Sequence, residues 1–137
     1  MAQSNVDLLR SGYERFNRQD LQAVLELFDE DIEWQEPDWL VGGQAGTLHG
    51  RDAVLREIFQ TVPDRWDRFE IEPRELYDAG DTVVAEGRFR ALPKGGTEWI
   101  DIPFAHVWRW RNGKAVSLHT YLDVKQLREL QTQRKAA

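Results

Sequence analysis

The feature that most constrains this fold is an alternating segment that turns back on itself just after Trp110. Large apolar side chains stand at every second position, at Ile102, Phe104, Trp108 and Trp110, and an Asn112–Gly113 step follows. Asn-Gly between two alternating segments is the strongest short-range signal for a β-hairpin with a tight turn. The period of two predicts that these side chains share one face of a long strand.

His106 falls in the same row as these apolar side chains. On the returning strand, His119, Tyr121 and Asp123 share one face by the same alternation. A titratable imidazole among large apolar side chains is what a substrate pocket needs. It is equally compatible with a packed sheet in which a neighbouring carboxylate satisfies the histidine. The sequence leaves both interpretations open.

Length and composition predict one globular domain spanning residues 1–137. The chain is 41% hydrophobic and 31% charged, which is typical of an ordered protein. A net charge of −6 argues against a nucleic-acid partner, and the absence of cysteine excludes disulfides and thiol nucleophiles. No apolar run approaches the ~20 residues that a membrane span needs. We therefore expect no membrane association and a cytoplasmic location.

Helical periodicity dominates the first half of the chain and strand periodicity the second. Apolar residues recur at helical spacing from Val6 to Phe16 and from Leu21 to Phe28, with Ser4 as a candidate N-cap. The pattern further predicts a helix over about 51–61, strands over 32–36, 68–77, 82–91, 98–111 and 114–123, and a short closing helix from 124. Helices followed by an antiparallel sheet predict an α+β domain with the helices on one sheet face.

Prolines and glycines qualify this pattern. Pro73 predicts a bulge or a sheet edge in the strand over 68–77, and Pro103 predicts a kink in the strand over 98–111. The glycine-rich segment 41–46 precedes no Lys-Ser/Thr pair, so a phosphate-binding loop is not expected. A flexible lid over a cavity is the favoured interpretation.

Five motifs, spread over nearly the whole chain, suggest a family. They are Phe16-Asn-Arg-Gln-Asp-Leu21, Leu27-Phe-Asp-Glu-Asp-Ile32, Glu36-Pro37, His49-Gly-Arg-Asp-Ala-Val54 and Phe104-Ala-His-Val-Trp-Arg-Trp-Arg-Asn-Gly-Lys114. In these motifs the chain resembles the NTF2-like superfamily, and most of all its SnoaL-like and ketosteroid-isomerase-related branch. The resemblance implies a cone in which a curved antiparallel sheet packs on three N-terminal helices and encloses a hydrophobic cavity, with a short C-terminal helix.

The resemblance also implies roles for individual residues. Ketosteroid isomerases place a proton-shuttling carboxylate directly before a proline, which here is Glu36, and an oxyanion donor on the long strand, which here is His106. Their tyrosine donor falls on Gly12. Tyr13 is adjacent, but one helical residue turns a side chain by about 100°, so it is not expected to replace that donor. SnoaL-like cyclases have an acidic residue on the last strand, which makes Asp123 a third catalytic candidate, although it could also N-cap the closing helix.

We therefore predict a cofactor-independent acid–base enzyme, an isomerase, cyclase or related proton-transfer catalyst rather than an epoxide hydrolase. Its substrate would be a small, largely apolar carbonyl, polyketide-like or steroid-like molecule. A glutamate buried near tryptophans should have a raised pKa, which suits a general base. The residues expected to bind the substrate are Trp34, Trp39, Phe104, Trp108, His119 and Tyr121. The histidine spacing predicts no metal site.

Two other classes of function remain open. The pocket could hold a small hydrophobic ligand without chemistry, or the fold could be a dimeric scaffold whose cone is filled by side chains. A homodimer through the outer sheet face, marked by Ala105 and Val107, is expected in every case because an open sheet leaves an apolar face.

Overall fold

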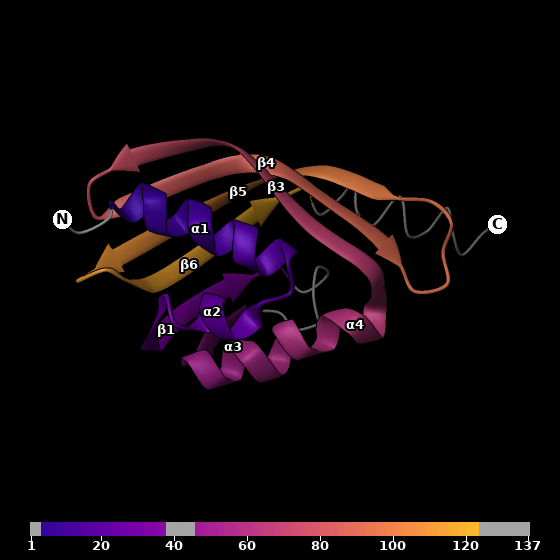
Figure 1. Cartoon of the computed structure of the whole chain (residues 1–137), viewed down its shortest axis with the longest axis horizontal. Coiled ribbons are helices and arrows are strands. Elements are labelled where there is room, and N and C mark those ends of the chain that lie inside the picture. The colour runs from indigo at the N-terminus through magenta and orange to yellow at the C-terminus, as the bar shows by residue number, and fades with distance from the viewer. Residues whose placement is uncertain (1–3, 38–45, 124–137) are drawn as a thin grey trace.

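The computed structural model describes residues 4–37 and 46–123 as helices packed on a curved sheet (Figure 1). The helices are α1 (Asn5–Asn17), α2 (Leu21–Leu25), α3 (Arg51–Glu57) and α4 (Val62–Arg65), with a 3-10 turn, η1 (Phe59–Thr61), before α4. The strands are β1 (Phe28–Glu36), β2 (Gly46–His49), β3 (Trp66–Ala79), β4 (Thr82–Pro93), β5 (Ile100–Arg111) and β6 (Lys114–Leu122). The predicted α+β class is confirmed.

The sheet is mixed rather than wholly antiparallel. Its strand order is β2-β1-β6-β5-β4-β3, and β1 runs parallel to β6, with Trp34 beside Leu118 and Gln35 beside His119. The neighbouring pairs on either side are antiparallel. Local sequence signals specify hairpins between consecutive strands, whereas β1 and β6 are separated by most of the chain. The expectation of an antiparallel sheet was therefore wrong for this pair.

The hairpin that the sequence specifies most strongly forms as predicted. Asn112 (φ 52°) and Gly113 (φ 75°) both adopt the left-handed conformation that a type I′ turn requires. Buried and more exposed residues alternate along β5, and its buried row is Ile100, Ile102, Phe104, His106, Trp108 and Trp110. The predicted face of this strand is confirmed.

The helix predicted over 51–61 is interrupted, and helical structure continues beyond it. Regular α3 ends at Glu57, and Ile58 (φ −112°, ψ −68°) departs from helical geometry before η1 begins. Pro63 does not end the helical region, because it lies in the first turn of α4, where a missing N–H costs no hydrogen bond.

The expectation for Pro73 is confirmed. β3 is an edge strand, and its register with β4 shifts between Pro73 and Glu75. Gly87 of β4 lies opposite, where a Cβ would stand 2.1 Å from the Glu72 carbonyl oxygen, so only glycine allows this close approach. Pro103, in contrast, pairs with Arg88 in unbroken register.

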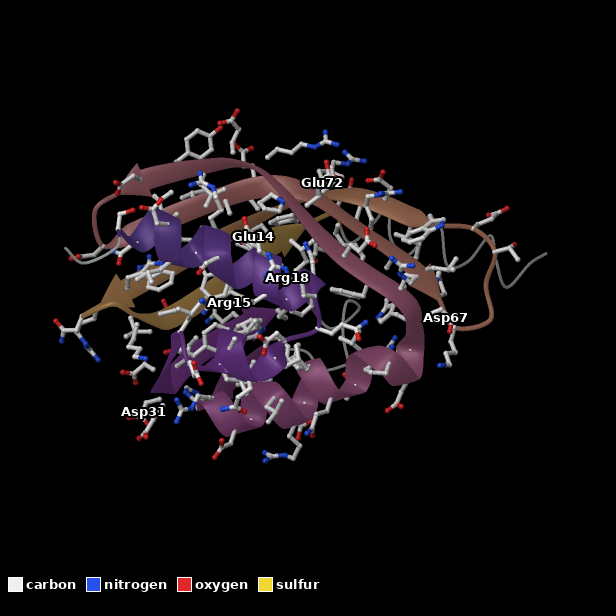
Figure 2. All side chains as sticks on the ribbon, viewed as in Figure 1. Glu14, Arg15, Arg18, Asp31, Asp67 and Glu72 are labelled. Carbon is white, nitrogen blue, oxygen red and sulfur yellow. The ribbon has the colours of Figure 1, made fainter. Side chains whose placement is uncertain are left out.

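The helices pack on one face of the sheet, and apolar side chains from both fill the space between them. Figure 1 shows α1 lying across the long strands and α3 and α4 lying below it. Charged side chains such as Glu14, Asp31 and Asp67 lie around the outside (Figure 2). None of the helices within residues 4–37 and 46–123 is long and apolar enough to cross a membrane.

Asn17 fastens the end of α1 to the open edge of the sheet. Its Nδ2 donates to the Ile71 carbonyl at 2.7 Å, and its Oδ1 accepts from the Ile71 amide at 3.0 Å. The side-chain amide thus replaces a neighbouring strand and satisfies two polar groups of edge strand β3. At the other end of α1, Ser4 caps the helix by accepting from the Asp7 amide at 3.1 Å. Both contacts fix the helix that carries Tyr13.

Replacing Asn17 with aspartate should destabilise the protein by about 0.5–1.5 kcal/mol, because the hydrogen bond to the Ile71 carbonyl is lost and a carboxylate oxygen then faces that carbonyl. Urea unfolding at pH 7 measures the change. Asn5→Asp is the matched control: its Nδ2 makes a single exposed hydrogen bond to Gly80, and a carboxylate there lies in the first turn of α1. Equal stabilities of the two variants would contradict the anchoring role of Asn17.

Candidate functional site

A pocket lies between the helices and the face of the sheet on which they pack. The centre of a water molecule can move through about 60 Å³ of this pocket. The pocket therefore has room for several waters, or for the part of a ligand that fills the same space. Most of its lining is aromatic or aliphatic. The polar side chains that line it include Tyr13, Glu36 and His106, which come from α1, β1 and β5.

Glu36 is the last residue of β1, and the alternation of the strand puts its side chain on the same face as Ile32 and Trp34. Its Oε1 accepts hydrogen bonds from Trp34 Nε1 at 3.1 Å and from Thr120 Oγ1 at 3.4 Å. Its Oε2 is buried and has no hydrogen-bond partner among the described residues. Burial raises the pKa of the Glu36 carboxyl from 4.5 to about 7, against the opposing effect of the two hydrogen bonds.

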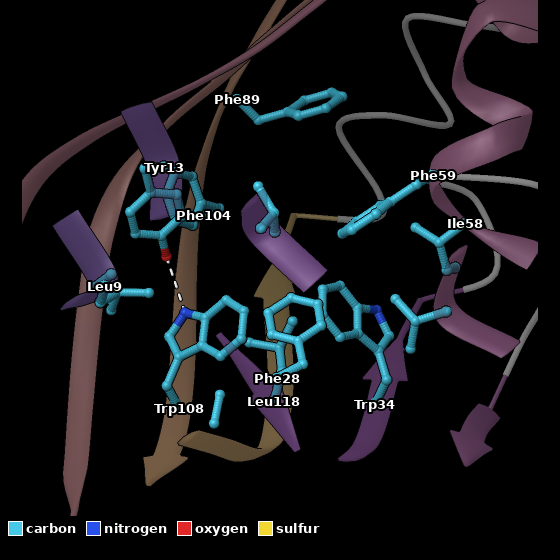
Figure 3. Packing of buried hydrophobic residues seen from close by; sticks show 14 of the residues in the cluster. Leu9, Tyr13, Phe28, Trp34, Ile58, Phe59, Phe89, Phe104, Trp108 and Leu118 are labelled. Atoms are coloured by element: carbon cyan, nitrogen blue, oxygen red, sulfur yellow. Dashed lines mark hydrogen bonds between the residues drawn. The ribbon is translucent and has the colours of Figure 1, made fainter. Parts of the chain in front are cut away.

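His106 is buried in the middle of β5, at 6% exposure. Its Nδ1 lies 2.7 Å from the hydroxyl of Tyr13, and Trp108 Nε1 donates to the same hydroxyl at 3.0 Å (Figure 3). The Tyr13 and His106 rings are nearly parallel, with 13° between their planes. Burial lowers the pKa of His106 to about 3 and raises the pKa of Tyr13, so both groups are neutral at pH 7.

Thr120 connects the two titratable groups across the sheet. It lies directly opposite His106 in the β5–β6 ladder, and its hydroxyl contacts Glu36 on β1. Glu36 and His106 therefore stand two strands apart, a backbone separation of about 10 Å, with both side chains on the pocket lining.

The residues predicted to bind substrate divide into two groups. Trp34, Phe104 and Trp108 line the pocket. His119 and Tyr121 are not among its lining residues: Tyr121 is 51% exposed, and the two rings stack on each other with centroids 4.1 Å apart. The described structure therefore places neither of these two rings in the pocket. Trp39 lies outside the described residues.

A bulge near the turn explains this placement. The β5–β6 register shifts between Arg109 and Trp110, so that His106 pairs with Thr120. In an unbroken hairpin closed at Asn112–Gly113, His106 would pair with His119. One inserted residue moves every later side chain of a strand to the opposite face. Leu118 and Thr120 are buried as a result, and His119 and Tyr121 lie on the outer face.

Asp123 follows β6 directly and is exposed, outside the pocket lining. This placement lends no support to its catalytic role, which stays a prediction. The closing helix that the sequence predicts from residue 124 lies outside the described residues.

Two polar residues of the site were not identified from the sequence, namely Tyr13 and Thr120. Tyr13 was set aside because position 13 is turned about 100° around the helix from position 12, yet Gly12 and Tyr13 both line the pocket. An apolar helix stripe is itself at least about 100° wide, so one step does not leave it. The available signal was the position of Tyr13 in the stripe of Leu9 and Phe16. No sequence signal was available for Thr120, because residue types do not reveal the bulge that turns its side chain to the buried face.

Within residues 4–37 and 46–123, no group of three histidine, aspartate or glutamate side chains is placed to hold a metal ion. The polar side chains of the pocket can transfer protons and make hydrogen bonds. Glu36 can take up or release a proton near neutral pH, and the Tyr13–His106 pair can contribute a hydrogen bond.

Glu36→Gln should change stability in a pH-dependent way. The folded protein holds the pKa of Glu36 at about 7, above its ordinary 4.5, so folding favours the protonated carboxyl. That stabilisation is complete below pH 4.5 and is lost as the pH rises through 7. Glutamine cannot ionise, so the variant should match the wild type near pH 4.5 and exceed it at pH 8 by up to about 3 kcal/mol in unfolding free energy.

Urea unfolding of both proteins from pH 4.5 to 8 measures this difference, in which the contribution of His106 cancels. Glu33→Gln, an exposed position on the same strand, should show no such trend. A difference between wild type and Glu36→Gln that stays constant with pH would show that Glu36 ionises as freely as a surface carboxyl.

The comparisons with known proteins agree with this architecture. The family model of the SnoaL-like domain matches residues 9–118. A solved NTF2-like protein of unknown function from Burkholderia pseudomallei is 31% identical, with a TM-score of 0.83 over 92% of this chain and 95% of that one. TerC, co-crystallised with polyporic acid, is 27% identical, with a TM-score of 0.80 over 92% and 96%.

A candidate polyketide cyclase from Pseudomonas putida is 15% identical, with a TM-score of 0.73 over 90% of this chain and 95% of that one, and this likeness shows the fold alone. None of the curated proteins compared with the chain matches it. Because the family model covers most of the sequence and its solved relatives share the fold over nearly their whole length, the chain belongs to the SnoaL-like family of the NTF2-like superfamily.

Proposed function

We propose that the protein is a cofactor-independent acid–base enzyme that moves a proton on a small, largely apolar carbonyl compound held in the pocket. The observation that carries this proposal is the state of Glu36. Its carboxyl has a pKa of about 7 because it is buried, and Oε2 has no partner among the described residues. A base of this pKa is present in both protonation states near neutral pH, which is optimal for accepting and returning a proton.

The proposed reaction begins with Glu36 as carboxylate. Oε2 accepts a proton from the carbon next to the substrate carbonyl, the C–H electron pair forms the enolate double bond, and the carbonyl π pair moves onto oxygen. A hydrogen bond from His106 stabilises that oxygen. Glu36 then returns its proton to the same or another carbon, which gives isomerisation in the second case. A positioned base contributes about 10²–10⁴-fold in rate, and one oxyanion donor about 10²–10³-fold.

The pocket lining supports an apolar substrate with few polar groups. Phe16, Phe59, Phe69 and Phe89 are among its lining residues, whereas its polar side chains are few. The comparison with TerC points in the same direction, since that protein was crystallised with polyporic acid. A one-ring ketone is the simplest probe of such a pocket.

Cyclohex-3-enone in D₂O tests proton transfer directly. Proton NMR should show that the wild type accelerates deuterium incorporation next to the carbonyl, conversion to cyclohex-2-enone, or both, above the buffer rate. Glu36→Gln should reduce the enzymatic rate by about 10²–10⁴-fold, and Glu33→Gln should leave it unchanged. The wild-type rate should rise with pH about a midpoint near 7, as Glu36 ionises. An unchanged rate in Glu36→Gln would exclude this residue as the base.

Ligand binding separates an enzyme from a plain binding pocket. Phenol resembles the enolate of cyclohexenone, and toluene has nearly the same shape without the oxygen. We expect phenol to raise the melting temperature of the wild type more than toluene does at equal concentration, and His106→Leu to lose that preference. Equal shifts with both ligands, together with a buffer-like rate, would indicate a non-catalytic apolar binder. No shift with either ligand would favour a scaffold.

A further inference from the structure

A buried relay of three side chains holds one ring nitrogen of His106. Trp108 Nε1 lies 3.0 Å from the Tyr13 hydroxyl oxygen, which in turn lies 2.7 Å from His106 Nδ1. Tyr13 and His106 lie on α1 and in the middle of β5, 93 positions apart in the sequence. All three side chains are buried, at 5–6% exposure, and line the pocket.

The direction of each hydrogen bond follows from the number of protons available. The indole of Trp108 can only donate, so the Tyr13 oxygen is the acceptor in the first contact. Because burial raises the pKa of Tyr13, its hydroxyl keeps its own proton and must donate it somewhere. The acceptor that the described residues offer is His106 Nδ1.

The opposite arrangement is costly. If His106 carried its proton on Nδ1, the Tyr13 oxygen would accept twice, and the hydroxyl proton would be left without an acceptor among the described residues. An unsatisfied buried donor costs about 1–3 kcal/mol. The arrangement Trp108→Tyr13→His106 avoids this cost because every proton in it has an acceptor.

We infer that Tyr13 and Trp108 are positioning residues that fix His106 as the tautomer protonated on Nε2, so that the histidine serves the pocket as a hydrogen-bond donor. With Nδ1 engaged by Tyr13, Nε2 is the ring nitrogen that remains for a ligand. A donor there selects ligands that place a carbonyl, enolate or phenolate oxygen against His106. This inference rests on the proposed function for its catalytic meaning, but the protonation pattern does not depend on activity.

Nitrogen-15 NMR of the histidine rings tests the inference on the full chain at pH 7.5. The sequence contains three histidines, so His106→Gln assigns the signal. In the wild type, Nδ1 of His106 should resonate as an unprotonated nitrogen and Nε2 as a protonated one. A protonated Nδ1 would overturn the proposal.

Tyr13→Phe removes only the hydroxyl oxygen and should release the tautomer. The Nδ1 and Nε2 signals of His106 should move toward each other as the two tautomers exchange. Tyr121→Phe is the matched control, because its hydroxyl lies 3.2 Å from Nδ1 of His119 on the outer face. It should change the His119 signals and leave those of His106 in place. His106 signals that Tyr13→Phe does not move would also overturn the proposal.

These spectra need no substrate, which separates the two ideas. A wild type with the expected protonation pattern and no activity on cyclohex-3-enone would count against the proposed function alone. An active wild type whose His106 is protonated on Nδ1 would count against the tautomer alone. Unchanged His49 signals in Tyr13→Phe would show that the variant is folded.

Discussion

The structure depends on how a few polar side chains are satisfied inside an apolar pocket. His106, Tyr13 and Glu36 are removed from water by the aromatic residues around them, and each would be costly there without a partner or a change of charge. The protein uses both solutions. Tyr13 and His106 contact each other, while Glu36 accepts from Trp34 on its own strand and has a raised pKa that keeps it neutral up to about pH 7.

The position of Tyr13 depends on hydrogen bonds outside the pocket, which surface side chains make to the backbone. The Asn17 side chain pairs with both backbone groups of Ile71, and Ser4 caps the opposite end of α1. Tyr13 lies one helical turn before Asn17, so the anchor that satisfies the sheet edge also sets the position of the tyrosine hydroxyl. The motif that includes Asn17 therefore connects fold stability with the geometry around His106.

Local sequence signals predicted much of the fold. The differences arose where pairing between distant strands or a single inserted residue determined the structure. Period-two alternation placed His106 correctly on the buried face of β5, and Glu36 before Pro37 was located at the end of β1. One bulge in β6 then moved His119 and Tyr121 outward, because a register shift of one residue reverses every later side chain. Such a bulge has no distinct residue signal in this turn.

The charges of the titratable side chains limit the chemistry that the pocket can perform. Below about pH 7 its titratable side chains are neutral: Glu36 is protonated, and His106, with its pKa lowered to about 3 by burial, is uncharged. Ionisation of Glu36 brings one negative charge into apolar surroundings. In the proposed reaction, proton abstraction would pass that charge to the substrate oxygen, so the total charge would be conserved while it moved across the pocket. A neutral donor on the far side, two strands from Glu36, would stabilise the charge after transfer more than before it, and that difference is what lowers a barrier.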